Sequence, residues 1–600
     1  MKLTITGSKN ARSYYVQKSI RKTGGKPTTV TIEKLGTEDE VRAKAGGRDP
    51  KEWAQEYVNE LNRREKEQNH SIIVSYSQSK LIGKGNLFSY NCGYLFLQCI
   101  LRDLKISKIC DDISKRHDFK YDLNDILSKL IYTRIIYPSS KLNSFEQSKN
   151  FLEQPSFDIH EVYRALSVLA DENDFIQSEL YKNSTRVINR NGSILYYDCT
   201  NYFFEIEQED GIKRYGKAKQ HQPLPLVGMG LFMDSDGIPL AFDIFPGNQN
   251  EQPTLKPLEE KIIKDFELGS IVVCTDAGLS STANRKFNNK SIGGKQVRSF
   301  ITTQSIKKLP SDLKEFALDP NGWWIPGSKK TYNLEELNLE EHYDTVFYKD
   351  RWITEEGSEK KRKKGIKPFE QHLIVSFSFK YKQYQRRIRE GQINRALKII
   401  SDGSKRRKSK TQNDPNRFIG SLDMTADGEA CAKHVLYLDE QVIKNEEQYD
   451  GFYAVCTNME DTDIHEIINI NRKRWEIEEC FRIMKTEFKA RPVYLRRDER
   501  IKAHFLTCFM ALVVYRILEK KLGENFTCRK IIDTLKKMSM HKHPNKCGYS
   551  PSYIRTEITD RLHETVGFRT DYEVISDMNM KKIIRQSKKQ SKNTISKLSK

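Results

Sequence analysis

The segment NRKRWEIEECFRIMK, residues 471–485, carries polar side chains at a spacing that packing alone does not require. The residues separated by intervals of three, four and seven positions are Asn471, Arg474, Glu478 and Lys485. At about 3.6 residues per turn, these intervals predict that all four side chains share one face of a helix, with a carboxylate between two cations. The alternative interpretation is a solvated helix face with ordinary ion pairs, each worth about 0.2–0.5 kcal/mol.

Two aspartates occur at apolar runs that are typical of buried strands. Asp198 follows ILYY, and Asp276 ends the run IVVCTD. A carboxylate at the end of a buried strand is costly unless it is paired or holds a cation, although a lone aspartate is more often a cap or a solvated acid. Together with Glu478, however, the two aspartates predict a site for Mg²⁺ or Mn²⁺, because these ions prefer oxygen ligands. Two such ions about 3.5–4 Å apart can activate a water and stabilise the leaving oxygen of a phosphodiester.

The elements that must position these acids are predicted from the pattern that begins at residue 193. Three β-rich runs, a helix and a fourth strand follow one another as SILYYDCTNYFFE, LPLVGMGLFMD, IPLAFDIFPG, PTLKPLEEKIIKDF and SIVVCTDAG. This order predicts an α/β core. A later strand, DGFYAVCTN, leads directly into the helix that carries Glu478.

About 170 residues separate Asp276 from that later strand. They alternate β-like segments with the basic runs 360–364, 386–389 and 405–410. A loop of this length needs structure of its own, so we interpret the segment as a β-rich inserted domain. We expect its most basic run to contact DNA phosphates through Lys405, Arg406, Arg407 and Lys408.

The flanking regions predict further modules. Residues 1–40 alternate as a β-hairpin, and a helix follows with Asp49 as its cap. The complete predicted organisation is an N-terminal hairpin and helix (1–86), a helical, DNA-binding region (87–190), the first part of the core (191–290), the β-rich basic insertion (291–447), the second part of the core (448–525), and a C-terminal helical region with a basic tail (526–600).

Composition limits the class of protein. The 600-residue chain has a formal net charge of +21 and a pI near 9.2, which favours a polyanionic partner. Its 11 cysteines form no CxxC pair, which indicates reduced thiols in the cytoplasm. The apolar segment 505–515 is shorter than a membrane span, and the N-terminus lacks the apolar core of a signal peptide, so no membrane role is expected.

The three acidic blocks, in their order along the chain, resemble those of the DDE transposases of bacterial insertion sequences. The quoted blocks are YYDCTNYF with Asp198, VVCTDAG with Asp276, and RWEIEECFRIMK with Glu478. The chain is similar to the subgroup that has a β-rich insertion before the glutamate helix and a Tyr, Arg, Glu and Lys signature. Arg474, Glu478 and Lys485 match this signature, whereas Asn471 stands at the Tyr position; an asparagine can still donate a hydrogen bond there.

The resemblance implies an α/β fold with a ribonuclease-H-like mixed sheet, and a DNA transposase that cleaves element ends and transfers their 3′-OH groups to target DNA. Asp198, Asp276 and Glu478 would be the catalytic metal ligands, holding two Mg²⁺ or Mn²⁺ ions. Arg474, Lys485 and Asn471 would contact the DNA. The partners would be double-stranded DNA of the terminal inverted repeats and the target, with a homodimer in the DNA complex, bound to the bacterial nucleoid. The alternative is a catalytically silent, transposase-derived DNA-binding protein.

Overall fold

The computed structural model describes residues 1–8, 11–20, 28–68, 74–217, 223–355, 368–402, 413–423, 434–544 and 547–589. The predicted DNA contacts Lys405, Arg406, Arg407 and Lys408, and the last part of the basic tail, lie outside these residues. The chain divides into two compact units. The first contains residues 1–90, 540–553 and 569–583, and the second contains the other described residues.

The first unit contains a three-stranded antiparallel sheet, where the sequence had predicted a two-stranded hairpin. The predicted strands are β2 (Ala11–Ile20) and β3 (Thr28–Thr37), and β1 (Lys2–Ser8) adds a third strand on the other side of β2. Helices α1 (Glu38–Ala45) and α2 (Pro50–Gln68) follow. Asp49 caps α2, as predicted, by accepting the backbone N–H groups of Lys51 and Glu52 at 2.8 and 2.9 Å.

The second unit is built on a mixed nine-stranded sheet with the order β11-β12-β15-β10-β8-β5-β6-β7, in which β9 pairs with β10. The strands from β5 to β8 are β5 (Ile194–Phe203), β6 (Leu226–Asp234), β7 (Pro239–Pro246) and β8 (Ile271–Thr275). Those from β9 to β15 in this sheet are β9 (Lys290–Ile292), β10 (Lys295–Gln304), β11 (Phe347–Glu355), β12 (Phe369–Phe377) and β15 (Phe452–Thr457). The pairs β5–β8 and β8–β10 are parallel, whereas β5–β6 and β6–β7 are antiparallel. This mixed α/β arrangement is consistent with the predicted ribonuclease-H-like core.

The two faces of the sheet at β5 have different neighbours. Leu195, Tyr197 and Cys199 belong to a buried cluster with residues of helix α9 (Leu255–Asp265). Successive strand residues point to opposite faces, so the even-numbered side chains of β5 lie on the other face. That face contains Asp198.

The segment predicted as a separate insertion, residues 291–447, contributes strands to the core sheet. β10 pairs with β8 on one side and with β15 on the other, and β11 and β12 extend the sheet beyond β15. The predicted insertion therefore begins with a strand, β10, that lies between the core strands β8 and β15. The remaining elements of this segment include helices as well as strands: α10 (Thr282–Phe287), α11 (Ser311–Leu318), α13 (Phe379–Ser401), β13 (Ile419–Asp423), β14 (His434–Leu438) and α14 (Glu440–Glu447).

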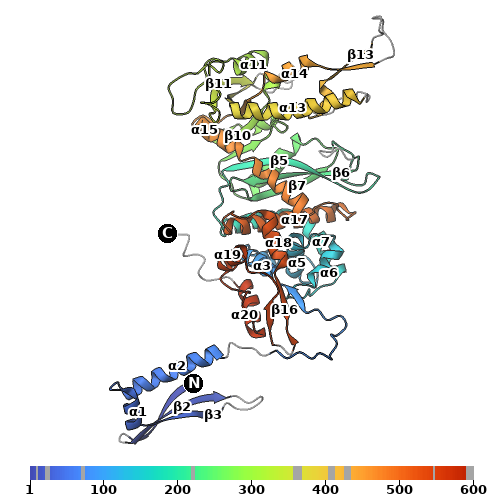
Figure 1. Cartoon of the computed structure of the whole chain (residues 1–600). Helices are drawn as coiled ribbons and strands as arrows, with labels where there is room; N and C mark the ends of the chain where they lie inside the picture. The colour runs from blue at the N-terminus through green and yellow to red at the C-terminus, as the bar shows by residue number, and fades with distance from the viewer. Residues whose placement is uncertain are drawn as a thin grey trace. The chain divides into compact units, whose positions relative to one another are not determined.

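The region predicted to be helical, 87–190, forms six helices after the short strand β4 (Ser89–Asn91). They are α3 (Tyr94–Asp103), α4 (Ile106–Ser114), α5 (Leu123–Ile136), α6 (Lys141–Ser148), α7 (Ile159–Asp171) and α8 (Asn173–Ser184). Helix α17 (Asp498–Lys521) contacts α3, α5 and α7 as well as strand β7 (Figure 1). The C-terminal elements are α18 (Cys528–Lys537), β16 (Ser539–Lys542), β17 (Tyr549–Pro551), α19 (Glu557–Val566) and α20 (Asp577–Lys588).

Helix α17 is the most apolar long helix of the described chain. It is long and apolar enough to cross a membrane by length and composition, but 94% of its most apolar window is buried inside the protein. It therefore serves as a core helix that joins the helical region to the sheet.

Candidate active site

Asp198 lies within β5, and Asp276 directly follows the last residue of the adjacent parallel strand β8. The register of β5 and β8 pairs Tyr196 with Cys274, two residues before each aspartate. Alternation within β5 places Asp198 on the same face as Tyr196, whereas Oδ1 of Asp276 accepts the N–H of Leu279 at 3.0 Å in the turn after β8. Both aspartates are half-buried.

That face is covered by the segment that carries Glu478. The hydroxyl of Tyr196 donates to the carbonyl of Ile470 at 2.9 Å, and the thiol of Cys274 donates to Oδ1 of Asn471 at 3.6 Å. Helix α15 (Ile464–Arg472) contacts β8 and β10, and α16 (Trp475–Arg482) contacts β5. The helical segment therefore covers the face of β5 that contains Asp198 and the strand β8 that precedes Asp276.

This segment is not the single regular helix that the spacing predicted. Four backbone hydrogen bonds between residues three apart tighten the chain after α15. They run from the N–H groups of Lys473, Arg474, Glu476 and Ile477 to the carbonyls of Ile470, Asn471, Lys473 and Arg474, at 3.2, 3.3, 3.0 and 3.2 Å. After α16, the chain widens into a π-helical turn, Ile483–Glu487. A tighter turn and a wider turn change the rotation per residue, so the four polar side chains do not form one straight stripe. Asn471 is only 3% exposed, whereas 63% of the Glu478 side chain is exposed.

Arg474 connects the three acids electrostatically. Its Nη1 lies 3.6 Å from Oε1 of Glu478. Burial alone would lower the pKa of the Arg474 guanidinium, but its interactions with Tyr453, Asp276 and Asp198 outweigh burial and raise the pKa above the usual value. The buried Nε of Arg474 has no hydrogen-bond partner among the described residues. In this structure Arg474 is therefore the counter-charge of the acids.

The donor set has the chemistry for a divalent ion, but the side chains are not gathered around one. Among the residues that the structure describes, no three His, Cys, Asp or Glu side chains are grouped so that they could hold a metal ion. Asp198 and Asp276 offer oxygen ligands on β5 and directly after the adjacent strand β8, which fits the preference of Mg²⁺ and Mn²⁺. Glu478 is exposed and is held by its ion pair with Arg474. The role of the three acids as metal ligands stays a prediction.

Lys485, on the π-helical turn, reaches the strand of Asp198. Its Nζ donates to the hydroxyl of Thr200, which lies two residues beyond Asp198 on the same face of β5. The ammonium also lies 5.3 Å from the centre of the Tyr202 ring. Arg474 and Lys485 thus approach β5 from two different turns of the segment.

Asn471 is occupied by protein partners. Its Nδ2 donates to the hydroxyl of Tyr453 at 2.7 Å, and Tyr453 also exchanges a hydrogen bond of 2.8 Å with Thr303. Tyr453 lies on β15, next to the strand β10 that carries Thr303. The hydroxyl of Tyr453 therefore lies next to the side-chain amide of Asn471, the residue at the Tyr position of the signature.

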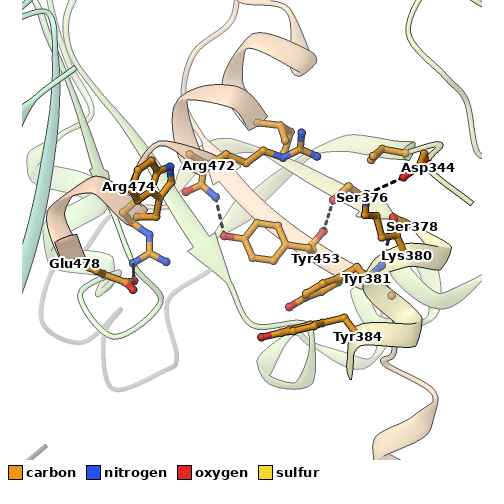
Figure 2. Close-up of a pocket in the computed structure, with 15 residues that line it drawn as sticks. Asp344, Ser376, Ser378, Lys380, Tyr381, Tyr384, Tyr453, Arg472, Arg474 and Glu478 are labelled. Atoms are coloured by element: carbon orange, nitrogen blue, oxygen red, sulfur yellow. Dashed lines mark hydrogen bonds and ion pairs between the residues drawn. The ribbon is translucent and has the colours of Figure 1, made fainter. Parts of the chain in front are cut away.

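A cavity of about 640 Å³ opens beside Arg474 and Glu478. Figure 2 shows Tyr381, Tyr384 and Tyr453 along it, together with Arg472 and Lys380. Aromatic faces interleaved with cations are typical of surfaces that bind nucleic acid. These tyrosines were not predicted as site residues. Tyr381 and Tyr384 lie on α13, which was not predicted as a helix, and the direction in which the Tyr453 side chain points depends on the strand register.

Trp475 on α16 is 61% exposed and lines the cavity. Within the basic run 386–389, Arg389 is buried and forms ion-paired hydrogen bonds of 2.7 and 2.5 Å with Asp450. A basic run can therefore contribute to packing as well as to a charged surface.

Comparison with known proteins identifies the chain's relatives. The sequence family described as a transposase DDE domain matches residues 198–514, which is more than half of the 600-residue chain. No curated protein matches. Among solved structures, the cryo-EM structure of the piggyBac transposase synaptic complex with hairpin DNA is 9% identical, with 81% of this chain and 87% of that chain covered and a TM-score of 0.35. The match begins at Asp198 and includes Asp276 and Glu478.

Proposed function

The chain belongs to the family of transposases with a DDE domain, and we propose that it binds the ends of a mobile DNA element, cleaves phosphodiester bonds there and joins the freed 3′-OH ends to target DNA. The observation that carries this proposal is the position of Asp198 and Asp276. Asp198 lies on β5 and Asp276 directly follows the adjacent parallel strand β8, and both strands are covered by the segment that carries Glu478.

Transposases of this family generally use divalent metal ions. We propose Asp198, Asp276 and Glu478 as the residues that would hold Mg²⁺ or Mn²⁺. When bound, two such ions supply an activated water and stabilise the leaving oxygen of a phosphodiester. The charges of Asp276 and Asp198 help to raise the pKa of the Arg474 guanidinium, and this proximity of both carboxylates to one cation supports the assignment of a shared site.

The cations of the site would hold the DNA. Arg474 and Lys485 lie on the side of the sheet that carries Asp198, and a phosphate placed there would receive charge-assisted hydrogen bonds from both. We propose that the hydroxyl of Tyr453, held by Asn471, provides the polar contact that a tyrosine at position 471 would have made. The tyrosines of the adjacent cavity would contact the strand beyond the cleaved bond.

The partner would be double-stranded DNA: the element's terminal inverted repeats first and the target second. Two copies of the chain would act together as a homodimer in the DNA complex. The basic run that includes Lys405 would supply affinity for DNA without reading its sequence, and the helical region 87–190 is the favoured module for reading the element ends.

Cleavage of a labelled duplex that carries the element's own terminus tests this function. The proposal expects cleavage in Mg²⁺, none in EDTA, and binding in both conditions. The competing function is a silent DNA-binding protein, which would bind the duplex equally well and cleave it in neither condition. Binding without cleavage would overturn the proposed enzymatic activity but would leave the proposed DNA binding in place.

A further inference from the structure

A second cavity, of about 540 Å³, is lined by none of the three acids and lies between the helical region and the chain that follows the π-helical turn. The described residues that line it include no aspartate or glutamate. Its basic side chains come from α5, α6, the segment after the π turn, and α17, and they are Arg134, Lys141, Lys489, Arg491 and His504.

Lys141 is the central feature of this cavity. Its side chain is buried, with the residue 5% exposed, and its Nζ has no hydrogen-bond partner among the described residues. Its charged neighbour Arg134 is also buried and is fixed by hydrogen bonds to the carbonyls of Phe488 at 3.1 Å and Ser139 at 3.0 Å. A buried, unpartnered ammonium beside a second cation is costly, unless an anion enters the cavity and pairs with it.

The backbone adds to this preference for an anion. Helix α6 begins at Lys141, and the hydroxyl of its N-cap, Ser140, accepts the N–H of Asn143 at 3.3 Å. The N–H groups of Lys141 and Leu142 have no acceptor within the helix, because they belong to its first turn. The positive end of the helix dipole therefore points to the same cavity as the ammonium.

We propose that this cavity binds one phosphate group, supplied either by the backbone of bound DNA or by free phosphate. The ammonium of Lys141 and the first turn of α6 would hold its oxygens, and Arg134 would add charge. Arg491, whose guanidinium lies 4.9 Å from the centre of the Phe203 ring, would neutralise it from the opposite wall. Binding of a phosphate group in this cavity does not depend on strand cleavage. That bound DNA supplies the phosphate rests on the proposed function.

The charges around Lys141 give the site a pH dependence. Burial and the neighbouring Arg134 lower the pKa of the Lys141 ammonium to about 7, with a small opposing effect of Cys508. His504, on α17, stays neutral, because burial, Arg134 and Lys141 lower its pKa well below the usual value and outweigh the opposing effect of its hydrogen bond with the carbonyl of Ala490. The other titratable or charged groups that line the cavity, among the described residues, are Lys489, Arg491 and the phenols of Tyr163 and Tyr494. A bound anion favours the protonated amine, so anion affinity falls as the pH rises through 7.

The first arm of the test uses sulfate, whose charge does not change between pH 6 and pH 8. The Tm of the full chain is measured against sulfate concentration, with chloride holding the ionic strength constant. We expect sulfate to raise the Tm, with higher affinity at pH 6 than at pH 8. Lys141→Met should weaken sulfate binding by about tenfold or more, since hydrogen bonds to charged groups contribute about 1.5–3 kcal/mol.

The variants are chosen so that misfolding does not decide the result. Lys141→Met replaces the unpartnered ammonium by an apolar side chain of similar length, so its Tm without sulfate should equal or exceed that of the wild type. Lys141→Arg keeps a positive charge and should retain sulfate binding. The matched control is Lys149→Met, at the exposed C-terminal end of the same helix, which should bind sulfate like the wild type.

The second arm separates the two sources of phosphate. If DNA supplies the phosphate, Lys141→Met should weaken binding to element ends and to random DNA alike and should reduce the salt slope by about one. If only sulfate binding is lost, free phosphate is the ligand and the proposed site still stands. Equal responses of wild type and Lys141→Met to both sulfate and DNA would overturn the proposal. Because sulfate binding needs no cleavage, failure of the proposed function would leave the first arm unaffected.

Discussion

The Nδ2 of Asn471 donates a 2.7 Å hydrogen bond to the hydroxyl of Tyr453, on a neighbouring strand of the core sheet. The asparagine is 3% exposed and lines the same cavity as the phenol. The family signature has a tyrosine at position 471, where this chain has an asparagine, and Tyr453 places a phenol hydroxyl close to Arg474 instead. Removing this hydroxyl therefore tests whether it has a role in the reaction.

Tyr453→Phe should lower the rate of strand cleavage by about tenfold while changing the free energy of unfolding by about 1 kcal/mol, which is the usual contribution of a hydrogen bond. Cleavage kinetics and chemical denaturation measure the two effects. Tyr437→Phe, on the exposed side of β14, is the control and should leave both unchanged. Wild-type cleavage by Tyr453→Phe would mean that the phenol only packs against Asn471.

Glu478→Gln separates a metal ligand from a helix-face ion pair. If Glu478 is a ligand, cleavage in Mg²⁺ should fall by several orders of magnitude, because the amide lacks the charge that balances a divalent cation. Binding to element ends should survive, since Arg474 and Lys485 remain. A gel shift and a cleavage assay on the same DNA provide the readout. Glu479→Gln, which loses its ion pair with Arg482, is the control and should cleave normally. Joint loss of binding and cleavage in Glu478→Gln would instead indicate a folding role.

Divalent ions should stabilise the folded chain. A ligand that binds only the folded state contributes about 2.7 kcal/mol at a concentration 100 times its Kd. We expect Mg²⁺ or Mn²⁺ to raise the Tm of the wild type, chelation to reverse the rise, and Asp198→Asn to reduce it. Asp236→Asn, whose carboxylate accepts a hydrogen bond from the backbone of Asn191, is the control for loss of an acid elsewhere. An unchanged metal response in Asp198→Asn would exclude this aspartate as a ligand.

The basic run should act on DNA of any sequence. Replacing Lys405, Arg406, Arg407 and Lys408 by Ala should weaken binding to element ends and to random DNA similarly. Each lost phosphate contact should reduce, by about 0.9, the steepness with which the logarithm of the binding constant falls with the logarithm of the salt concentration. Fluorescence anisotropy at several salt concentrations measures both effects. If the variant loses discrimination between the two DNAs but keeps its affinity for random DNA, these side chains read bases.

Glu259 predicts a pH dependence of stability. Burial raises the pKa of this carboxyl to about 7, against the lowering effect of its hydrogen bond from Asn288. Between about pH 4.5 and 7 the folded state keeps a proton that the unfolded state releases, so the free energy of unfolding should decrease as the pH rises through this window. Glu259→Gln should flatten the decrease in denaturant titrations, whereas its neighbour Glu260→Gln should not. The same slope in Glu259→Gln and wild type would show that other groups cause it.

The sequence determined the elements of the core and the order of its acids. The strands around Asp198 and Asp276 form as predicted, and the helical segment around Glu478 follows its strand as predicted. This agreement has a local cause, because a period of two or of 3.6 in apolar residues selects a strand or a helix within about 10 residues. The sequence of the acidic blocks also predicted the transposase family, which the family match confirms.

The tertiary structure decided which elements meet. Strand β10 was assigned to the insertion, but it lies between β8 and β15, because pairing depends on which strand edges become adjacent and not on the pattern within one strand. The tight turn at Arg474 and the π turn at Lys485 likewise replace one straight helix face. The packing of the whole segment decides whether each N–H donates to the carbonyl three, four or five residues earlier. The contact of Asn471 with Tyr453, and the cavity that brings Lys141 to Arg491, join residues far apart in sequence. Only the folded chain places such residues in contact, since local propensity carries no information about distant partners.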